Sequence, residues 1–247
     1  MTTSSRFTSL AAHLSVWIVS LGVLVFTSVL GANYYLSRYM LEDYIGDLAL
    51  QTISSTVNEI ETIFKTVASD AESLAAVVSG TNLNEEQIHG TIKAFIASDP
   101  DIFGMTVALE PGVLHDSVGE FSPYYYRKGN EIAYSDLADP GYRYREWDWY
   151  RIPKARNEPV WSEPYMDTGG GNVLMTTYSV PIRLADGLQL AGIATADIEL
   201  GWLEEFVNKI RIGETGFGYI VSSEDIVIAH PDKSLNMKPL ADILSGE

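Results

Sequence analysis

The sequence contains no cysteine, only four histidines, and 16 basic against 33 acidic side chains. The absence of cysteine excludes a disulfide scaffold, a thiol nucleophile and a cysteine-ligated zinc site. The histidines His13, His89, His115 and His230 show no i, i+4 pair of the kind that holds zinc on a helix. The formal net charge of −17 argues against nucleic acid as a partner, because its phosphates would repel such a surface.

Sequence motifs of common enzyme classes are also missing. The chain has no P-loop, no G-x-G-x-x-G and no G-x-S-x-G. Carboxylates are abundant, so a hydrolase with an acidic pair stays open, but no spacing selects a pair. The glycine run 169–171 is followed by strand-like residues, which favours a hairpin over a phosphate cradle. We therefore expect no cofactor, no metal site and no catalytic residues here.

A long uncharged run lies between Arg6 and Arg38. Its apolar part supplies the ~20 residues that a bilayer core requires, and aromatic residues at both ends fit the membrane interfaces. A cleaved signal peptide is a weaker alternative because its apolar core has about 7–15 residues, and a buried soluble helix is rarely so apolar. We predict a transmembrane helix over residues 14–35 and a cytoplasmic tail over residues 1–13, which leaves the acidic remainder outside the cytoplasm.

A helical pattern follows the apolar run. Apolar residues recur in steps of three and four from Ile53 to Val78, which places them on one stripe of a helix. We predict a long stalk helix over residues 36–79. Its stripe packs on its own domain, pairs two chains in a homodimer, or does both.

Strand-like segments begin near Phe103, in the order FGMTVAL, SPYYYRK, EIAYSD, NVLMTTYSVPI and LQLAGIATADI. Before them, Asn84 and Gln87 have the spacing of a helix capping box. Turn residues at 169–171 and 185–187 predict two hairpins. The pattern indicates an α+β fold with an antiparallel sheet.

The last part of the sequence predicts a helix over residues 200–210 and two more strands after Gly213. A second sheet thus begins but is not completed before Glu247. We interpret the sequence as the N-terminal part of a longer protein.

The segment from Tyr142 to Tyr165 combines aromatic and charged residues at high density. Part of this density is explained by ordinary core packing. However, large apolar walls with a few orienting polar groups are also what a small-molecule pocket requires. The composition therefore predicts a ligand pocket built from this segment.

An N-terminal anchor and long helix, followed by WDWY, WSEPYMD, LMTTYSVPI, GIATADIEL, GFGYIVS and IAHPD in this order, resemble a double Cache sensor domain. The resemblance covers about residues 36–247 and implies PAS-like modules in the periplasm, on the inner membrane of a bacterium. It implies a membrane-distal ligand-binding module over residues 80–212 and the start of a membrane-proximal module over residues 213–247. It also implies a cytoplasmic output such as chemotaxis signalling, a histidine kinase, a serine phosphatase or cyclic-dinucleotide synthesis.

Amino-acid-binding members of this family share a motif whose matching positions here are Tyr142, Trp149, Tyr150, Tyr165 and Asp197. The arginine of that motif, which holds the ligand carboxylate, is replaced by Trp147. The resemblance thus leaves an acid among aromatic rings, which suits a cation.

We predict an amine or quaternary ammonium ligand with Asp197 as its counter-charge, and a cage of Trp147, Trp149, Tyr150 and Tyr165. An amino-acid or carboxylate sensor that uses Arg145 is the alternative. A membrane-anchored extracytoplasmic hydrolase is a further alternative. For Asp197, the competing interpretation is a cap for the helix that begins near Leu200.

Overall fold

The computed structural model describes residues 4–114, 119–183, 189–212 and 215–245. The chain divides into two compact units, Met1–Thr52 and Ile53–Glu247, and helix α1 (Ser4–Gly80) contributes to both. In the first unit the large apolar side chains of α1, such as Trp17 and Phe26, are exposed. Among the described residues, α1 is the one helix that is long and apolar enough to cross a membrane.

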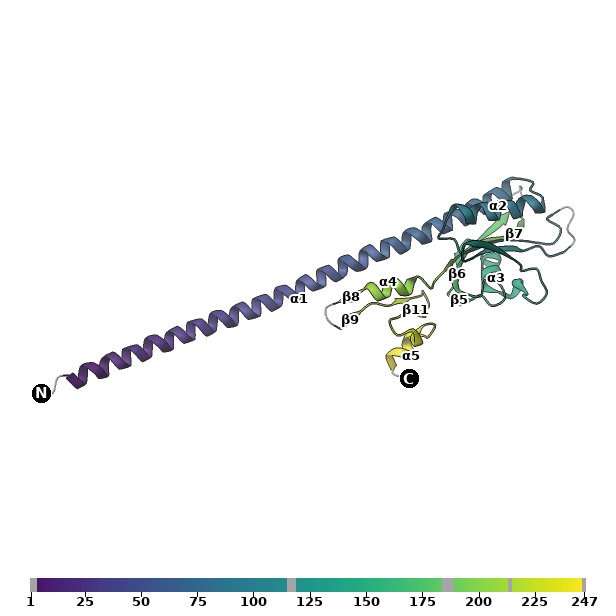
Figure 1. Ribbon diagram of the computed structural model, residues 1–247. Coiled ribbons are helices and arrows are strands. Elements are labelled where there is room, and N and C mark those ends of the chain that lie inside the picture. The colour runs from purple at the N-terminus through teal and green to yellow at the C-terminus, as the bar shows by residue number, and fades with distance from the viewer. Residues whose placement is uncertain (1–3, 115–118, 184–188, 213–214, 246–247) are drawn as a thin grey trace. The chain divides into compact units, whose positions relative to one another are not determined.

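An antiparallel sheet of seven strands forms the centre of the described part of the second unit. The strand order is β3-β2-β1-β7-β6-β4, and β5 also pairs with β6. Figure 1 labels β5, β6 and β7 of this sheet. The bounds are β1 (Gly104–Leu109), β2 (Pro123–Lys128), β3 (Glu131–Asp136), β4 (Val160–Trp161), β5 (Tyr165–Met166), β6 (Leu174–Arg183) and β7 (Leu190–Glu199). The predicted α+β fold with an antiparallel sheet after a long N-terminal helix is confirmed.

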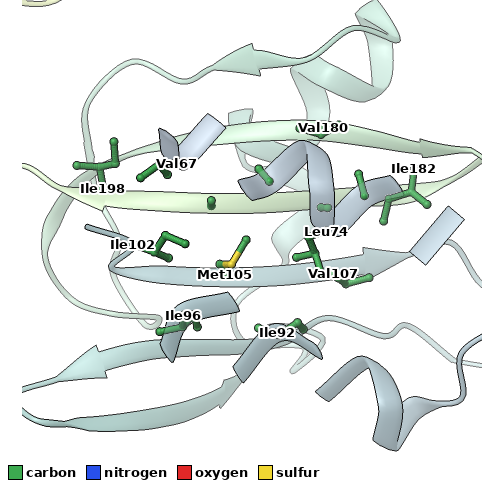
Figure 2. Close-up of a cluster of buried hydrophobic side chains, with 14 of the residues drawn as sticks. Val67, Leu74, Ile92, Ile96, Ile102, Met105, Val107, Val180, Ile182 and Ile198 are labelled. Carbon is green, nitrogen blue, oxygen red and sulfur yellow. The ribbon is translucent and has the colours of Figure 1, made fainter. Parts of the chain in front are cut away.

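One face of the sheet is covered by the last turns of α1 and by α2 (Glu85–Ser98). Figure 2 shows the apolar side chains that meet there, including Leu74 of α1, Ile96 of α2 and Met105 of β1. The helical stripe therefore packs on its own domain from Ile60 onward. Burial of such side chains is the main stabilising contribution of this face.

The predicted capping box at the start of α2 is confirmed. The side chain of Asn84 accepts a hydrogen bond from the backbone N–H of Gln87, and the Gln87 side chain accepts one from the backbone N–H of Asn84, both at 2.9 Å. These two bonds satisfy N–H groups that the first helical turn leaves without partners.

The opposite face of the sheet is covered by η1 (Tyr144–Glu146) and α3 (Asp148–Arg156). Helix α3 is followed by its C-cap residue Asn157, whose φ of 54° lies in the left-handed region that asparagine tolerates. The aromatic segment thus folds into two short helical pieces across the sheet, where its rings form a second cluster of buried side chains.

The predicted hairpin at Gly169–Gly171 is confirmed, because β5 and β6 pair antiparallel across it. The turn predicted at 185–187 lies outside the described residues. The predicted helix over 200–210 is present as α4 (Leu203–Lys209). The remaining elements are β8 (Arg211–Ile212), β9 (Gly216–Phe217), β10 (Ile220–Val221), β11 (Val227–Ala229), η2 (Lys233–Leu235) and α5 (Leu240–Ser245).

Candidate functional site

The alternation of side chains along the strands brings polar groups together on the face that α3 covers. Residues two apart on a strand point to the same face. Thr177 of β6 and Asp197 of β7 are directly opposite each other in the strand register, and Asp197 is opposite Gly104 of β1 on its other side. The central strands therefore present a buried carboxylate toward α3.

A small cavity lies above this carboxylate. Its polar and aromatic lining includes Tyr124, Tyr142, Trp149, Tyr165, Asp167 and Asp197. The space they enclose is about 10 Å³, which is about the volume that admits one water molecule. The cavity is thus nearly closed, and any ligand larger than a water molecule requires its lining to move apart.

Asp197 is 2% exposed and lies at the end of a short hydrogen-bond chain. The Thr177 hydroxyl donates to Asp197 Oδ1 at 2.7 Å, and the Tyr165 hydroxyl lies 2.7 Å from Thr177 Oγ1. Because the single Thr177 proton points to Asp197, Tyr165 is the donor in the second bond. These bonds fix the position of the carboxyl group.

The pKa of Asp197 is raised to about 7, mainly by burial. The charge of Asp167 contributes to the rise, while the hydroxyls of Thr177 and Tyr124 oppose it. A proton on Asp197 therefore comes off near neutral pH, and a cation placed beside the carboxyl group favours its loss.

Asp167 is the second buried carboxylate of the cavity, with an exposure of 1%. It accepts hydrogen bonds from the Tyr142 hydroxyl, at 2.6 Å, and from the backbone N–H of Gly171. Burial raises its pKa, and these two bonds oppose the shift. A Cβ at Gly170 would lie 2.2 Å from Asp167 Oδ2, so the glycine run lets the backbone wrap closely around this carboxylate.

Four of the predicted site residues, Tyr142, Trp149, Tyr165 and Asp197, line the same cavity. Trp147 lies outside it, stacked on the Tyr142 ring with centroids 5.3 Å apart and planes within 5°. Its ring centroid is also 5.4 Å from that of Tyr165. Trp147 therefore forms an outer layer over two of the cavity walls.

Tyr150 and Arg145 lie away from the cavity. The Tyr150 hydroxyl donates to Glu110 Oε1 at 2.5 Å. The Arg145 guanidinium pairs with Glu110 at 3.2 Å and with Glu120 at 2.8 Å. In the part of the chain that the structure describes, the cavity lining contains no lysine or arginine.

Sequence reasoning did not identify Tyr124, Asp167 or Thr177. Pairing the two predicted strands that contain Thr177 and Asp197 could have found Thr177, because directly opposite residues of neighbouring strands lie on the same face of the sheet. Asp167 follows Tyr165 by two residues in the same hairpin, and its place beside the glycine run was the available signal. For Tyr124 the sequence holds no such signal, because β2 is brought near Asp197 only by the sheet order.

Comparison with known proteins supplies independent findings. Residues 88–205 match the family model for the first PDC sensor domain of methyl-accepting chemotaxis protein-like receptors. The methyl-accepting chemotaxis protein McpG of Pseudomonas putida is 25% identical over 222 residues, which are 90% of this chain and 31% of McpG. This chain thus spans about a third, or less, of the length of the relatives it matches.

Solved structures give a similar result. The extracellular domain of mmHK1S-Z3, described as a histidine kinase, has a TM-score of 0.64 at 25% identity and covers 73% of this chain and 68% of that one. The ligand-binding domain of the Pseudomonas aeruginosa amino acid chemoreceptor PctC, solved with GABA, has a TM-score of 0.57 at 23% identity. The match covers 82% of this chain and 80% of the PctC domain.

Proposed function

We propose that the cavity of the PDC sensor domain over residues 88–205, which the resemblance to Cache sensor domains predicts, binds a small ligand through a protonated nitrogen. The region is thus a sensor, not an enzyme. In this proposal Asp197 is the counter-charge of the ligand, Asp167 is a second carboxylate beside it, and the rings of Trp149, Tyr142 and Tyr165 are the walls.

The observation that carries this proposal is the pair of buried carboxylates without a basic partner in the described lining. Burying a carboxylate is costly unless a cation or hydrogen bonds compensate for it. Asp197 and Asp167 have hydrogen bonds, but Arg145 lies away from the cavity and is already paired with Glu110 and Glu120. A cationic ligand would supply the missing positive charge in a place that aromatic faces also favour.

Binding has to open the cavity, because the enclosed space is far smaller than an amine or amino acid. Helix α3 and the Tyr142–Trp147 stack lie on the face of the sheet opposite α1, and we place the opening there, so that their movement would reach α1 through the sheet. A ligand that stabilises the open arrangement shifts the population toward it. This shift is the signal in our proposal.

Residues 14–35 are the transmembrane part of α1 in this proposal, and the sensor lies outside the cytoplasm. We further propose a distal module over residues 80–212, the start of a second module over residues 213–247, and chemotaxis signalling as the output.

The apolar stripe is occupied by the sheet from Ile60 onward, so a homodimer would use the stalk before that point. Light scattering of the detergent-solubilised chain tests the dimer, and a monomer would contradict it.

Two classes of ligand carry the cationic nitrogen that Asp197 would bind in this proposal. The lack of a basic residue in the described lining supports an amine or quaternary ammonium. The relation to PctC, which was solved with GABA, supports an amino acid instead. Both classes share the cationic nitrogen, so a test of Asp197 addresses the proposal before the class is known.

Isothermal titration calorimetry of the full 247-residue chain in detergent provides that test. The panel contains putrescine, choline, L-arginine, L-valine, γ-aminobutyrate and the anion succinate. We expect binding of at least one cationic compound and none of succinate. Asp197→Asn should weaken that binding by about 100-fold, because a buried charge pair loses one partner.

The matched control is Asp148→Asn. It also replaces one carboxylate by an amide, but on α3 and at an exposed side chain that pairs with Arg151. This variant should bind as the wild type does. Equal affinity of the wild type and Asp197→Asn would contradict the proposal, and so would binding of succinate alone.

A further inference from the structure

The hydroxyl of Tyr124 is a buried polar group in the cavity to which the proposed function gives no role toward the ligand. Tyr124 lies on β2 and is 2% exposed. Within the described residues its hydroxyl has no hydrogen-bond partner in good geometry, although it lies near enough to Asp197 for the two groups to shift each other's pKa. A buried hydroxyl without a partner is unfavourable in a folded protein.

Gly104 on β1 explains how this hydroxyl reaches the cavity. A Cβ at Gly104 would lie 2.4 Å from the Tyr124 hydroxyl oxygen and 2.7 Å from two carbons of its ring. The hydroxyl end of the ring therefore occupies a space that the side chain of every other residue at position 104 would fill. Gly104 is opposite Asp197 in the strand register, so the hydroxyl is delivered to the buried carboxylate.

The other hydroxyls that line the cavity and have partners point their protons elsewhere. Tyr142 donates to Asp167, Tyr165 donates to Thr177, and Thr106 donates to the carbonyl oxygen of Pro123 at 2.9 Å. Burial and the charge of Asp197 raise the pKa of Tyr124 well above its usual value, so Tyr124 keeps its proton. Tyr124 is thus a protonated donor that lines the cavity beside the carboxylate.

We propose that Tyr124 donates a hydrogen bond to an acceptor oxygen of the ligand while Asp197 holds the cationic nitrogen of the same ligand. Because the two groups are neighbours in the cavity, the acceptor lies close to the nitrogen, as in an α-amino acid. This inference rests on the proposed function and narrows its ligand class. In this inference the Tyr124 hydroxyl binds the ligand oxygen in a cavity whose described lining contains no arginine.

The test uses two pairs of compounds that differ only by a carboxylate: L-arginine with agmatine, and L-valine with isobutylamine. Affinities for the full chain are measured by calorimetry in detergent. Tyr124→Phe removes one oxygen atom, so the fold is retained, and thermal unfolding verifies this. We expect a loss of at least about 10-fold for the amino acid of a pair that binds, and less than about 2-fold for its amine.

Tyr144→Phe is the matched control. Tyr144 is also fully buried with a hydroxyl that lacks a partner in the described residues, but it lies outside the cavity. Its removal should leave all four affinities unchanged. Gly104→Ala is a second variant, which displaces the Tyr124 ring and should weaken amino-acid binding in the same direction.

The outcomes are distinct. An equal loss for both members of a pair would overturn the inference, because Tyr124 would then act only by supporting Asp197. Unchanged affinities in Tyr124→Phe, or a wild type that binds only the amines, would also overturn it and leave the proposed function intact. If the wild type binds none of the four compounds or the other cations of the panel, the proposed function fails, and this inference fails with it.

Discussion

The two faces of the same sheet differ in what they bury. The face under α1 and α2 buries aliphatic side chains such as Val107, Ala196 and Ile198. The face under α3 buries Thr177 and Asp197 from the same central strands, together with tyrosine and tryptophan rings. In every strand the side chains alternate between the two faces, so the difference comes only from which residue types stand at the alternate positions.

This difference separates stability from recognition within one element. Apolar burial stabilises the fold without regard to the identity of a ligand. Buried polar groups cost stability unless they are paired, and their arrangement fixes which molecule can complete them. We therefore expect substitutions on the apolar face to change the free energy of unfolding but not the ligand affinity, and substitutions of the cavity groups to change the ligand affinity. The following measurements test this.

The largest expected effect is on the apolar face. Leu74→Ala leaves a cavity at a fully buried position and should lower the free energy of unfolding by about 2–5 kcal/mol. Urea denaturation of the full chain measures this value. Ligand affinity of the folded fraction should not change. Val57→Ala on the exposed part of the same helix is the control, and an equal loss there would show that Leu74 is not part of a packed face.

The second effect is a pH dependence that arises on the polar face. Because the pKa of Asp197 is raised to about 7, the folded state holds a proton that the unfolded state releases near pH 4. The free energy of unfolding should therefore fall as the pH rises from about 4 to about 7, by about 2–4 kcal/mol from this group.

Denaturation curves across this pH range, compared between the wild type and Asp197→Asn, isolate the contribution. Asp70, Asp101 and Asp167 also have raised pKa values, but they remain in both chains. Asp197→Asn should have the flatter profile and should not be less stable than the wild type at pH 7. Parallel profiles would mean that Asp197 is not protonated in the folded state.

The smallest effect concerns the helix cap on the apolar face. Asn84→Ala removes the acceptor for the Gln87 backbone N–H and should cost about 1 kcal/mol. Asn84→Asp should restore most of this loss, since a carboxylate caps equally well. Neither variant should alter ligand affinity. A change in affinity would show that α2 takes part in recognition and would weaken the distinction between the faces.

Much of the fold could be predicted from local patterns. The capping pair Asn84 and Gln87, the strand segments and the turn at Gly169–Gly171 each reflect interactions between residues close in sequence. The helical stripe from Ile53 to Val78 likewise predicted a buried surface, and the structure packs it from Ile60 onward. The pattern left open whether its own domain or a second chain covers this surface, because that contact joins residues far apart in sequence.

The site was predictable in part. Tyr142, Trp149, Tyr165 and Asp197 belong to a motif that the sequence carries in order, and they line one cavity. Trp147 and Tyr150 belong to the same stretch, but the turn at η1 and the helical phase of α3 direct their side chains elsewhere. Composition alone does not specify which face of a short helix meets the sheet.

The sequence by itself determined the apolar N-terminal helix, the α+β class and the aromatic segment that covers the site, because these depend on local periodicity and composition. Only the tertiary structure decided that Asp167 joins Asp197, that Arg145 is engaged by Glu110 and Glu120, and that Gly104 makes room for Tyr124. Each of these contacts depends on strand order and register, which bring together groups that no local pattern relates.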